Sequence, residues 1–359
     1  MQPITSNSTA TLPLPTERQN PDMTTDSSVH TTADRQHASG TLGAALAVAF
    51  CAIPLVAAIG GIAYSLPDTP KAQRAAAEKA ALAAKQAQTA QAGLQPAAYS
   101  VPDARAIPDS KMGEWIQRGE AIFLRTPENA KGFSGNSLNC VNCHLDAGRL
   151  KNAAPMWGAY PLYPAYRKKT DHVDTFAERV RGCFMYSMNG KAPDDGHDIL
   201  VAVEAYAYWM AQKAPLGEKL PGAGFQKLPQ AQVVPTLEAG QKVYAAKCAL
   251  CHGDSGQGQK KDGVTVFPAL WGKDSYNWGA GMHEIDKAAS FIRSNMPYGL
   301  HNDLSEQEAW EVATFINSFE RPQDPRFNGD IARTREVFHN SPNSLYGVEV
   351  NGKLLGKGT

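Results

Sequence analysis

The chain has 359 residues, of which 35 are Lys or Arg and 35 are Asp or Glu, so its formal net charge is zero. Bulk electrostatics therefore gives no reason to bind nucleic acid, and any charge-dependent function must be local. With 43% hydrophobic residues the composition is that of a folded protein, and the length allows about two domains. Six cysteines are too few for a disulfide scaffold at this size.

The N-terminal region divides into three segments. Residues 1–41 are polar without an apolar period, which predicts a disordered tail. Residues 42–66 contain no charged side chain and are long enough to cross a membrane, which predicts a transmembrane anchor with Cys51 as an apolar filler. An N-terminal signal peptide is the alternative, although the apolar stretch exceeds a usual signal-peptide core. Residues 67–108 are rich in Ala and then in Pro, which predicts a helical stalk and a linker.

Two pentapeptides carry the strongest signal in the chain. They are Cys140-Val141-Asn142-Cys143-His144 and Cys248-Ala249-Leu250-Cys251-His252. C-x-x-C-H is the attachment motif of c-type haem, in which both thiols form thioethers with the porphyrin and the histidine becomes the proximal iron ligand. The sequence therefore predicts two covalently bound haem c groups.

The two motifs lie within a repeated framework. The segment from Gly119 to Phe123 precedes the first motif and matches the segment from Gly240 to Tyr244 before the second. Each half closes with an aromatic-rich helix, and the second of these begins at a capping box from Ser305 to Glu308. No window shows the sustained alternation of a sheet. The pattern resembles the class I cytochrome c fold and predicts an all-α protein with two such domains in tandem, at 109–232 and 233–359, the latter including a C-terminal tail.

Each iron needs a group on its distal side or an open position. In the second half Met296 stands directly before Pro297, which predicts a thioether ligand and a raised reduction potential. In the first half the repeat places Met188 near the equivalent position. Cys183 lies just ahead of it and is the only cysteine of residues 67–359 outside the two motifs. From the residues alone, Cys183 is either a buried small side chain or a thiolate ligand.

Further runs around these residues show a family resemblance. They are Asn139 to Arg149, Asn152 to Pro155, Gly158 to Pro161, and Arg179 to Phe184 followed by Ser187 to Lys191. Together they closely resemble the dihaem thiosulfate dehydrogenases, which form tetrathionate, over roughly residues 110–320. The tail, anchor and stalk are departures from the usual soluble member of that family.

The resemblance implies a set of roles. His144 and Cys183 would ligate the catalytic haem, Met188 would compete for its iron, and His252 with Met296 would ligate the second haem. Lys169, Arg179 and Ser187 would contact the substrate. Two thiosulfate ions would be coupled to tetrathionate, with electrons passing through the second haem to a cytochrome c or a membrane oxidase, and the reverse reaction would use the same parts.

Local charge agrees with an anionic substrate. Between Arg149 and Lys191 eight residues are basic and three are acidic, an excess of five that the zero net charge conceals. Such a cluster would attract a small dianion toward the first haem. The alternatives are a solvated basic surface or contacts to the haem propionates.

Haem attachment of this kind takes place outside the cytoplasm, which predicts a periplasmic body held at the inner membrane by residues 42–66. The basic residues just after the anchor would favour the opposite orientation by the positive-inside rule. We give the haem chemistry more weight.

Three other functions stay open at this point. A membrane-tethered dihaem electron carrier would use Met188 as ligand and have no substrate chemistry of its own. A dihaem peroxidase would need an acid–base residue beside an open iron, and a haem subunit of a sulfur-oxidising complex would need partner proteins. The remaining histidines of the body are predicted to be structural or on the surface, namely His172, His197, His283, His301 and His339.

Overall fold

The computed structural model describes residues 99–359, which belong to one compact unit of the chain. The predicted tail 1–41, the predicted anchor 42–66 and most of the predicted stalk and linker 67–108 lie outside the described residues. Across residues 99–359, none of the helices has the length and apolar character needed to cross a membrane.

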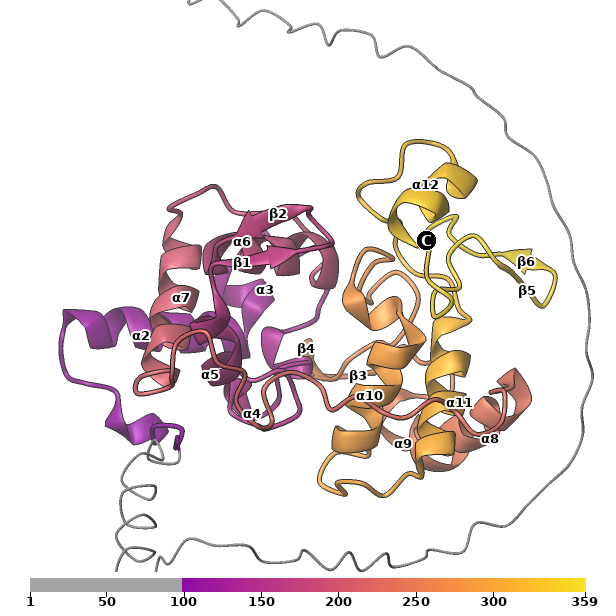
Figure 1. Ribbon diagram of the computed structural model, residues 1–359, viewed down its shortest axis with the longest axis horizontal. Helices are drawn as coiled ribbons and strands as arrows, with labels where there is room; N and C mark the ends of the chain where they lie inside the picture. Colours follow the sequence, from indigo (N-terminus) through magenta and orange to yellow (C-terminus); the bar gives the residue numbers. More distant parts are fainter. Residues whose placement is uncertain (1–98) are drawn as a thin grey trace, which may run out of the picture. The chain divides into compact units, whose positions relative to one another are not determined.

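A pair of long helices frames the first haem motif. Helix α2 (Lys111–Leu124) and helix α7 (Asp198–Met210) lie side by side (Figure 1). Ser110 begins α2 by accepting a hydrogen bond from the backbone of Gly113. The crossing is close because Gly119 has no side chain: a Cβ there would lie 2.1 Å from the carbonyl oxygen of Ala202 in α7.

The second half repeats this arrangement. Helix α8 (Leu237–Lys247) packs against α11 (Glu306–Asn317), and α10 (Ile285–Asn295) packs against α11 as well (Figure 1). A Cβ on Gly240 would lie 2.2 Å from the carbonyl oxygen of Glu311. The predicted capping box at the start of α11 is present between Ser305 and Glu308. The two aligned glycines therefore make the same kind of helix crossing in both halves.

Short elements connect the long helices. The short α-helices are α3 (Thr126–Asn129), α4 (Leu145–Gly148), α5 (Met156–Ala159), α6 (Phe176–Gly182) and α9 (Ala249–His252). The 3-10 turns are η1 (Ala104–Ala106), η2 (Cys140–Asn142), η3 (Tyr160–Leu162) and η5 (Gly281–His283). A π-helix, η4 (Cys183–Ser187), continues directly from α6.

The fold is largely helical, as predicted, but the all-α prediction missed three short antiparallel strand pairs. They are β1 (Ala165–Arg167) with β2 (His172–Asp174), β3 (Gln259–Lys261) with β4 (Val264–Phe267), and β5 (Glu349–Val350) with β6 (Lys353–Leu354). Within residues 99–359 no strand exceeds four residues. Strands this short contain too few residues for an alternating pattern to stand out in the sequence.

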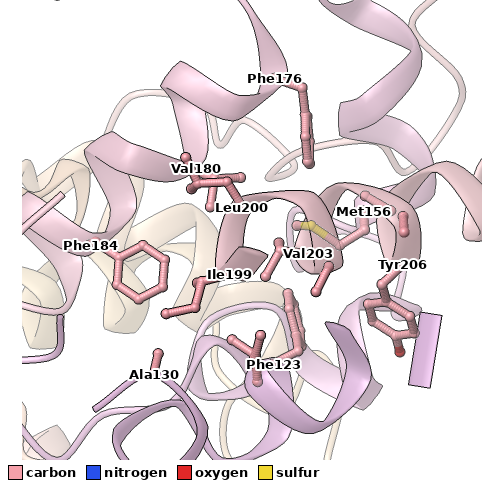
Figure 2. Close-up of a cluster of buried hydrophobic side chains, with 14 of the residues drawn as sticks. Phe123, Ala130, Met156, Phe176, Val180, Phe184, Ile199, Leu200, Val203 and Tyr206 are labelled. Carbon is pink, nitrogen blue, oxygen red and sulfur yellow. The ribbon is translucent and has the colours of Figure 1, made fainter. Parts of the chain in front are cut away.

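The core of the first half packs against the first haem motif. Buried side chains converge from α2, α6, α7 and η4, as Figure 2 shows for Phe123, Val180, Val203 and Phe184. A second core cluster surrounds α10 and α11. The C-terminal segment adds helix α12 (Ile331–Phe338) and a third, smaller cluster of Trp278, Tyr346 and Leu355.

The C-terminal segment also carries a buried polar chain. Asp324 accepts a hydrogen bond from Nε2 of His339 at 2.9 Å and forms an ion pair with Arg326 at 2.6 Å. Nδ1 of His339 lies 3.1 Å from Nε2 of His283. His283 and His339 are 4% and 1% exposed. These two histidines are thus structural, in agreement with one of the two roles predicted for them.

Replacing Asp324 with alanine is expected to lower the free energy of unfolding by about 3–5 kcal/mol at pH 7, because the buried His339 and the partly buried Arg326 would lose their partner. Burial raises the pKa of Asp324, but His339 and Arg326 outweigh it and hold that pKa below its ordinary value. The carboxylate therefore stabilises the fold above about pH 4, and the stabilisation is lost as the pH falls further.

Guanidinium unfolding at pH 7 and at low pH measures the free energy of unfolding of wild type and of Asp324→Ala. The difference between the two proteins should become smaller at low pH. Asp303→Ala is the control, because Asp303 pairs with Lys247 on the surface, where an ion pair contributes less than about 1 kcal/mol. Equal losses in the two variants would contradict the prediction.

Candidate haem and substrate site

The first C-x-x-C-H motif is fixed to its surroundings by side chains from α3 and from its own turn. Thr126 accepts a hydrogen bond from the backbone of Cys140 at 3.1 Å and donates to its Sγ at 3.3 Å. Asn139 and Asn142 form a capping box around η2. The two cysteines and His144 therefore stand in a turn whose backbone is held at both ends.

The ring of His144 has a defined tautomer. Its Nδ1 lies 2.6 Å from the carbonyl oxygen of Ala154. A carbonyl can only accept, so Nδ1 carries a hydrogen, and Nε2 is the ring nitrogen left to face an iron. This second hydrogen bond is the one that orients histidine ligands of metals.

A cavity of about 990 Å³, part of it open to solvent, adjoins this motif. Cys140, Cys143 and His144 line it from one segment, and Cys183, Ser187 and Met188 line it from η4 and the residue after it. Most of the other lining residues are apolar, including Phe123, Leu138, Phe176, Val180, Phe184 and Val203. Two thiols, a histidine with a free Nε2 and an apolar enclosure are what a c-type haem requires, so the residues present fit this group.

The neighbours of Cys183 favour the thiolate form of its side chain. Helix α6 begins at a capping box of Thr175 and Glu178 and places Arg179 one turn before Cys183. Nη1 of Arg179 donates to Sγ of Cys183 at 2.9 Å. Burial by itself raises the pKa of this thiol, but Arg179 and His144 outweigh it and lower the pKa to about 6. The sulfur is therefore a thiolate at neutral pH, and it faces His144.

Met188 lies in the same cavity wall but in a different setting. It is 3% exposed and packs into the apolar core of the first half. Its backbone amide donates to the carbonyl of Cys183, which closes the π-helical turn. The structure thus brings both predicted ligands of the first haem to the cavity that His144 lines, and it is Cys183 that accepts a hydrogen bond from Arg179 there.

The three predicted substrate contacts do not all lie in the cavity wall. Arg179 and Ser187 line the cavity, whereas Lys169 is not among its lining residues. Lys169 is an exposed residue, but its ammonium group lies 3.5 Å from the ring centre of Tyr186 and donates to the carbonyl of Gly279. Burial of this group, together with the nearby Arg326 and Arg179, lowers the pKa of Lys169 to about 7.

The basic cluster seen in the sequence is partly neutralised. Arg167 pairs with Asp174 at 3.0 Å, Arg181 with Asp195 at 2.6 Å, and Arg149 with Glu120 at 3.7 Å. The excess of five charges therefore does not face the cavity as a whole. Among the basic residues of 149–191, it is Arg179 that lines the cavity and donates to a sulfur atom.

The second C-x-x-C-H motif repeats the geometry of the first. Nδ1 of His252 lies 2.9 Å from the carbonyl oxygen of Pro268, which leaves Nε2 free, and burial lowers the pKa of this ring. Cys248 and Met296 pack against the same core cluster. Leu250, between the two cysteines, is 88% exposed.

Sequence reasoning missed the residues that reach the first cavity from the second half. Tyr276 and Met282 line it, although they follow Cys143 by more than 130 residues. Neither residue belongs to a motif. The alignment of the two halves does not reveal them either, because it compares the halves with each other and says nothing about contacts between them. A contact between distant segments leaves no local pattern in a single sequence.

Two C-x-x-C-H turns in a helical core, each with its histidine oriented by a backbone carbonyl, define a c-type cytochrome. Residues 235–316 match the family described as cytochrome c oxidase, cbb3-type, subunit III. The chain as a whole belongs to the thiosulfate dehydrogenase family. It is 54% identical over 260 residues to the thiosulfate dehydrogenase of Thiomonas intermedia, covering 72% of this chain and 83% of the relative.

Two further comparisons agree. The thiosulfate dehydrogenase of Stutzerimonas stutzeri is 50% identical over 262 residues, covering 72% of this chain and 85% of the relative. A solved structure of thiosulfate dehydrogenase (TsdBA) from Marichromatium purpuratum matches with a TM-score of 0.70 and 44% identity, over 73% of this chain and 58% of that chain. The described fold is thus shared with a solved member of the family.

Proposed function

We propose that this protein oxidises two thiosulfate ions to one tetrathionate, with Cys183 as the reacting sulfur, and carries two covalently bound haem c groups. The observation that carries the proposal is the placement of Cys183, which accepts a hydrogen bond from Arg179 and has a lowered pKa, in the wall of the cavity that His144 also lines. A structural cysteine buried among apolar residues would have a raised pKa instead.

The reaction balances in two steps. The Cys183 thiolate and the outer sulfur of one thiosulfate form an S–S bond, which releases two electrons and leaves Cys183 linked to S–SO₃⁻. The outer sulfur of a second thiosulfate then attacks the sulfur attached to Cys183, the bond to Cys183 breaks, and tetrathionate leaves while the thiolate is restored. Haems bound at the two motifs would accept the two electrons.

The protein side chains supply the electrostatics of these steps. Arg179 holds the Cys183 sulfur as a thiolate when it is free, and its charge offsets the repulsion between two approaching dianions. Ser187 lies in the cavity wall, where its hydroxyl can donate to a sulfonate oxygen. Lys169 stands outside the lining, so its proposed part is to attract the anion toward the cavity rather than to hold it at the reacting sulfur.

The second half is proposed to pass the electrons on. His252 and Met296 would ligate its haem, and a cytochrome c or a membrane oxidase would take the electrons. The same residues would serve the reverse reaction, tetrathionate reduction. The body is proposed to lie in the periplasm, held at the inner membrane by residues 42–66, because c-type haem is attached outside the cytoplasm.

One experiment tests the reaction and the location together. Spheroplasts that express the full-length haem-loaded protein are given thiosulfate and ferricyanide, an acceptor that does not cross the inner membrane. We expect two ferricyanide ions to be reduced for each tetrathionate formed, with no such activity in spheroplasts lacking the protein. An electron carrier without substrate chemistry would give no tetrathionate from the purified protein. Activity that appears only after lysis would contradict the proposed location.

A further inference from the structure

The π-helical turn that bears Cys183 has carbonyl groups that its own helix cannot satisfy. Within the segment, the carbonyls of Cys183 and Phe184 accept from Met188 and Gly190. The later carbonyls need donors from elsewhere, because a helix end leaves its last carbonyls without intrahelical partners. Residues 135 and 136 provide two of these donors, for Met188 and Ser187.

The other two donors come from one residue of the second half. Asn277 donates its side-chain amide to the carbonyl of Met185 at 2.8 Å and its backbone amide to the carbonyl of Tyr186 at 3.2 Å. The same side-chain nitrogen donates to Oδ1 of Asn189 at 3.0 Å. Asn277 is 1% exposed. A single buried residue therefore supplies two of the four donors that cap the turn carrying the reacting sulfur.

The shape of Asn277 suits this position. Its side-chain oxygen accepts from the backbone of Gly279 at 3.0 Å while its nitrogen serves the turn. Asp would have the same size but no hydrogens to donate, and Ala would remove both the donor and the acceptor. Asn277 thus links the 277–279 loop to the Cys183 turn through a side chain that donates to the turn and accepts from the loop.

A further contact joins the same two segments at Gly279, two residues after Asn277. Gly279 presses on the ring of Tyr186, because a Cβ there would lie 2.3 Å from Cδ1 of that ring. Lys169 and Arg326 lie over the same ring, at 3.5 Å and 5.2 Å from its centre. Tyr186 stands three residues after Cys183, so its position and that of the sulfur are set together.

Residues of the C-terminal segment hold the 277–279 loop in place through hydrogen bonds. The backbone amide of Trp278 donates to the carbonyl of Pro322 at 3.0 Å, and its indole donates to Glu320 at 2.6 Å. Trp278 is fully buried. The loop that holds the Cys183 turn therefore has a fixed position of its own and does not follow the turn if the turn moves.

We propose that Asn277 is a positioning residue, which holds the turn so that Cys183, and not Met188, faces His144. This rests on the proposed function, in which Cys183 is the reacting sulfur. Both sulfurs lie in the wall of one cavity, and an exchange between them requires the turn to rotate. Rotation would break the bonds from Asn277 to the carbonyls of Met185 and Tyr186. Asn277 thereby also returns Cys183 to its place after each turnover.

The test compares Asn277→Ala and Asn277→Asp with wild type in the full-length haem-loaded protein. We expect amide hydrogen exchange of the 183–189 segment to accelerate by about tenfold or more, because the side-chain bonds to Met185 and Asn189 are lost while the backbone bond to Tyr186 remains. We expect the ferric spectrum of the first haem to show a fraction with a thioether in place of the thiolate, and kcat to fall by about tenfold with KM little changed. Adding Met188→Leu to Asn277→Ala should restore the thiolate spectrum, because the competing sulfur is gone.

Thr334→Val is the matched control. It removes one buried hydroxyl, which donates to Asp330 in the C-terminal segment, and it touches no residue of the Cys183 turn. Wild-type exchange and spectrum in both Asn277 variants, with a loss of stability like that of Thr334→Val, would overturn the proposal. So would a failure of both variants to fold, since Asn277 would then be purely structural.

Cys183→Ala separates the two proposals. If it keeps the wild-type spectrum and activity, the proposed function fails. If it loses them while the Asn277 variants keep theirs, only the positioning role of Asn277 fails.

Discussion

Replacing Cys183 with alanine is expected to lower the rate of tetrathionate formation by about a thousandfold or more, equivalent to about 4 kcal/mol of barrier. The reason is that the proposed route runs through a bond between Cys183 and the first thiosulfate, and no other cysteine outside the haem motifs is present in residues 99–359. The measurement is ferricyanide reduction by thiosulfate with the purified full-length protein, at matched haem content.

Met188→Leu is the companion variant, because it removes the other candidate ligand from the same cavity wall. Its ferric spectrum should keep the thiolate signature of the first haem, whereas that of Cys183→Ala should change to a thioether or an open form. The opposite result, with the spectrum changed in Met188→Leu and preserved in Cys183→Ala, would assign the ligand to Met188 and remove Cys183 from the reaction.

Replacing Arg179 with alanine is expected to lower kcat/KM for thiosulfate by about a hundredfold, the usual size of effect when one donor to a reacting anion is lost. Its Nη1 is 2.9 Å from the Cys183 sulfur, and its charge lies in the wall that two dianions must approach. Arg179→Lys should recover part of the loss, since it keeps the charge but loses the planar donor geometry. Steady-state kinetics over a range of thiosulfate concentrations measures this.

Arg181→Ala is the control for charge on the same helix. Arg181 pairs with the exposed Asp195 at 2.6 Å and is not among the residues lining the cavity. Its removal should change kcat/KM by less than about threefold, since an exposed pair contributes little. Equal losses in Arg179→Ala and Arg181→Ala would mean that general positive charge, rather than the contact with Cys183, serves the reaction.

Local patterns were enough for the framework of the fold. The two C-x-x-C-H motifs, the capping box at Ser305 and the aligned glycines at 119 and 240 are each defined within a few residues. The structure gives all of them a definite place: the glycines lie at two equivalent helix crossings, and both motif histidines donate to a carbonyl. The predicted anchor 42–66 lies outside the described residues and stays a prediction.

The site was only partly accessible from the sequence. Spacing alone left Cys183 and Met188 as alternatives, and it treated the basic residues of 149–191 as one cluster. In the structure Arg149, Arg167 and Arg181 are paired with carboxylates, while Arg179 meets the Cys183 sulfur. Which charges are neutralised depends on partners brought near by folding.

The sequence by itself thus determined the chemistry available to this protein: two haem attachment motifs, one further cysteine in residues 67–359 and a repeated helical unit. These follow from short-range rules, because helix periodicity, capping and attachment motifs act within one or two turns. Tertiary structure alone decided which sulfur faces His144 and what holds it there. Tyr276, Asn277 and Met282 reach the first cavity and its Cys183 turn from the other half of the chain, and such contacts arise only when distant segments pack together.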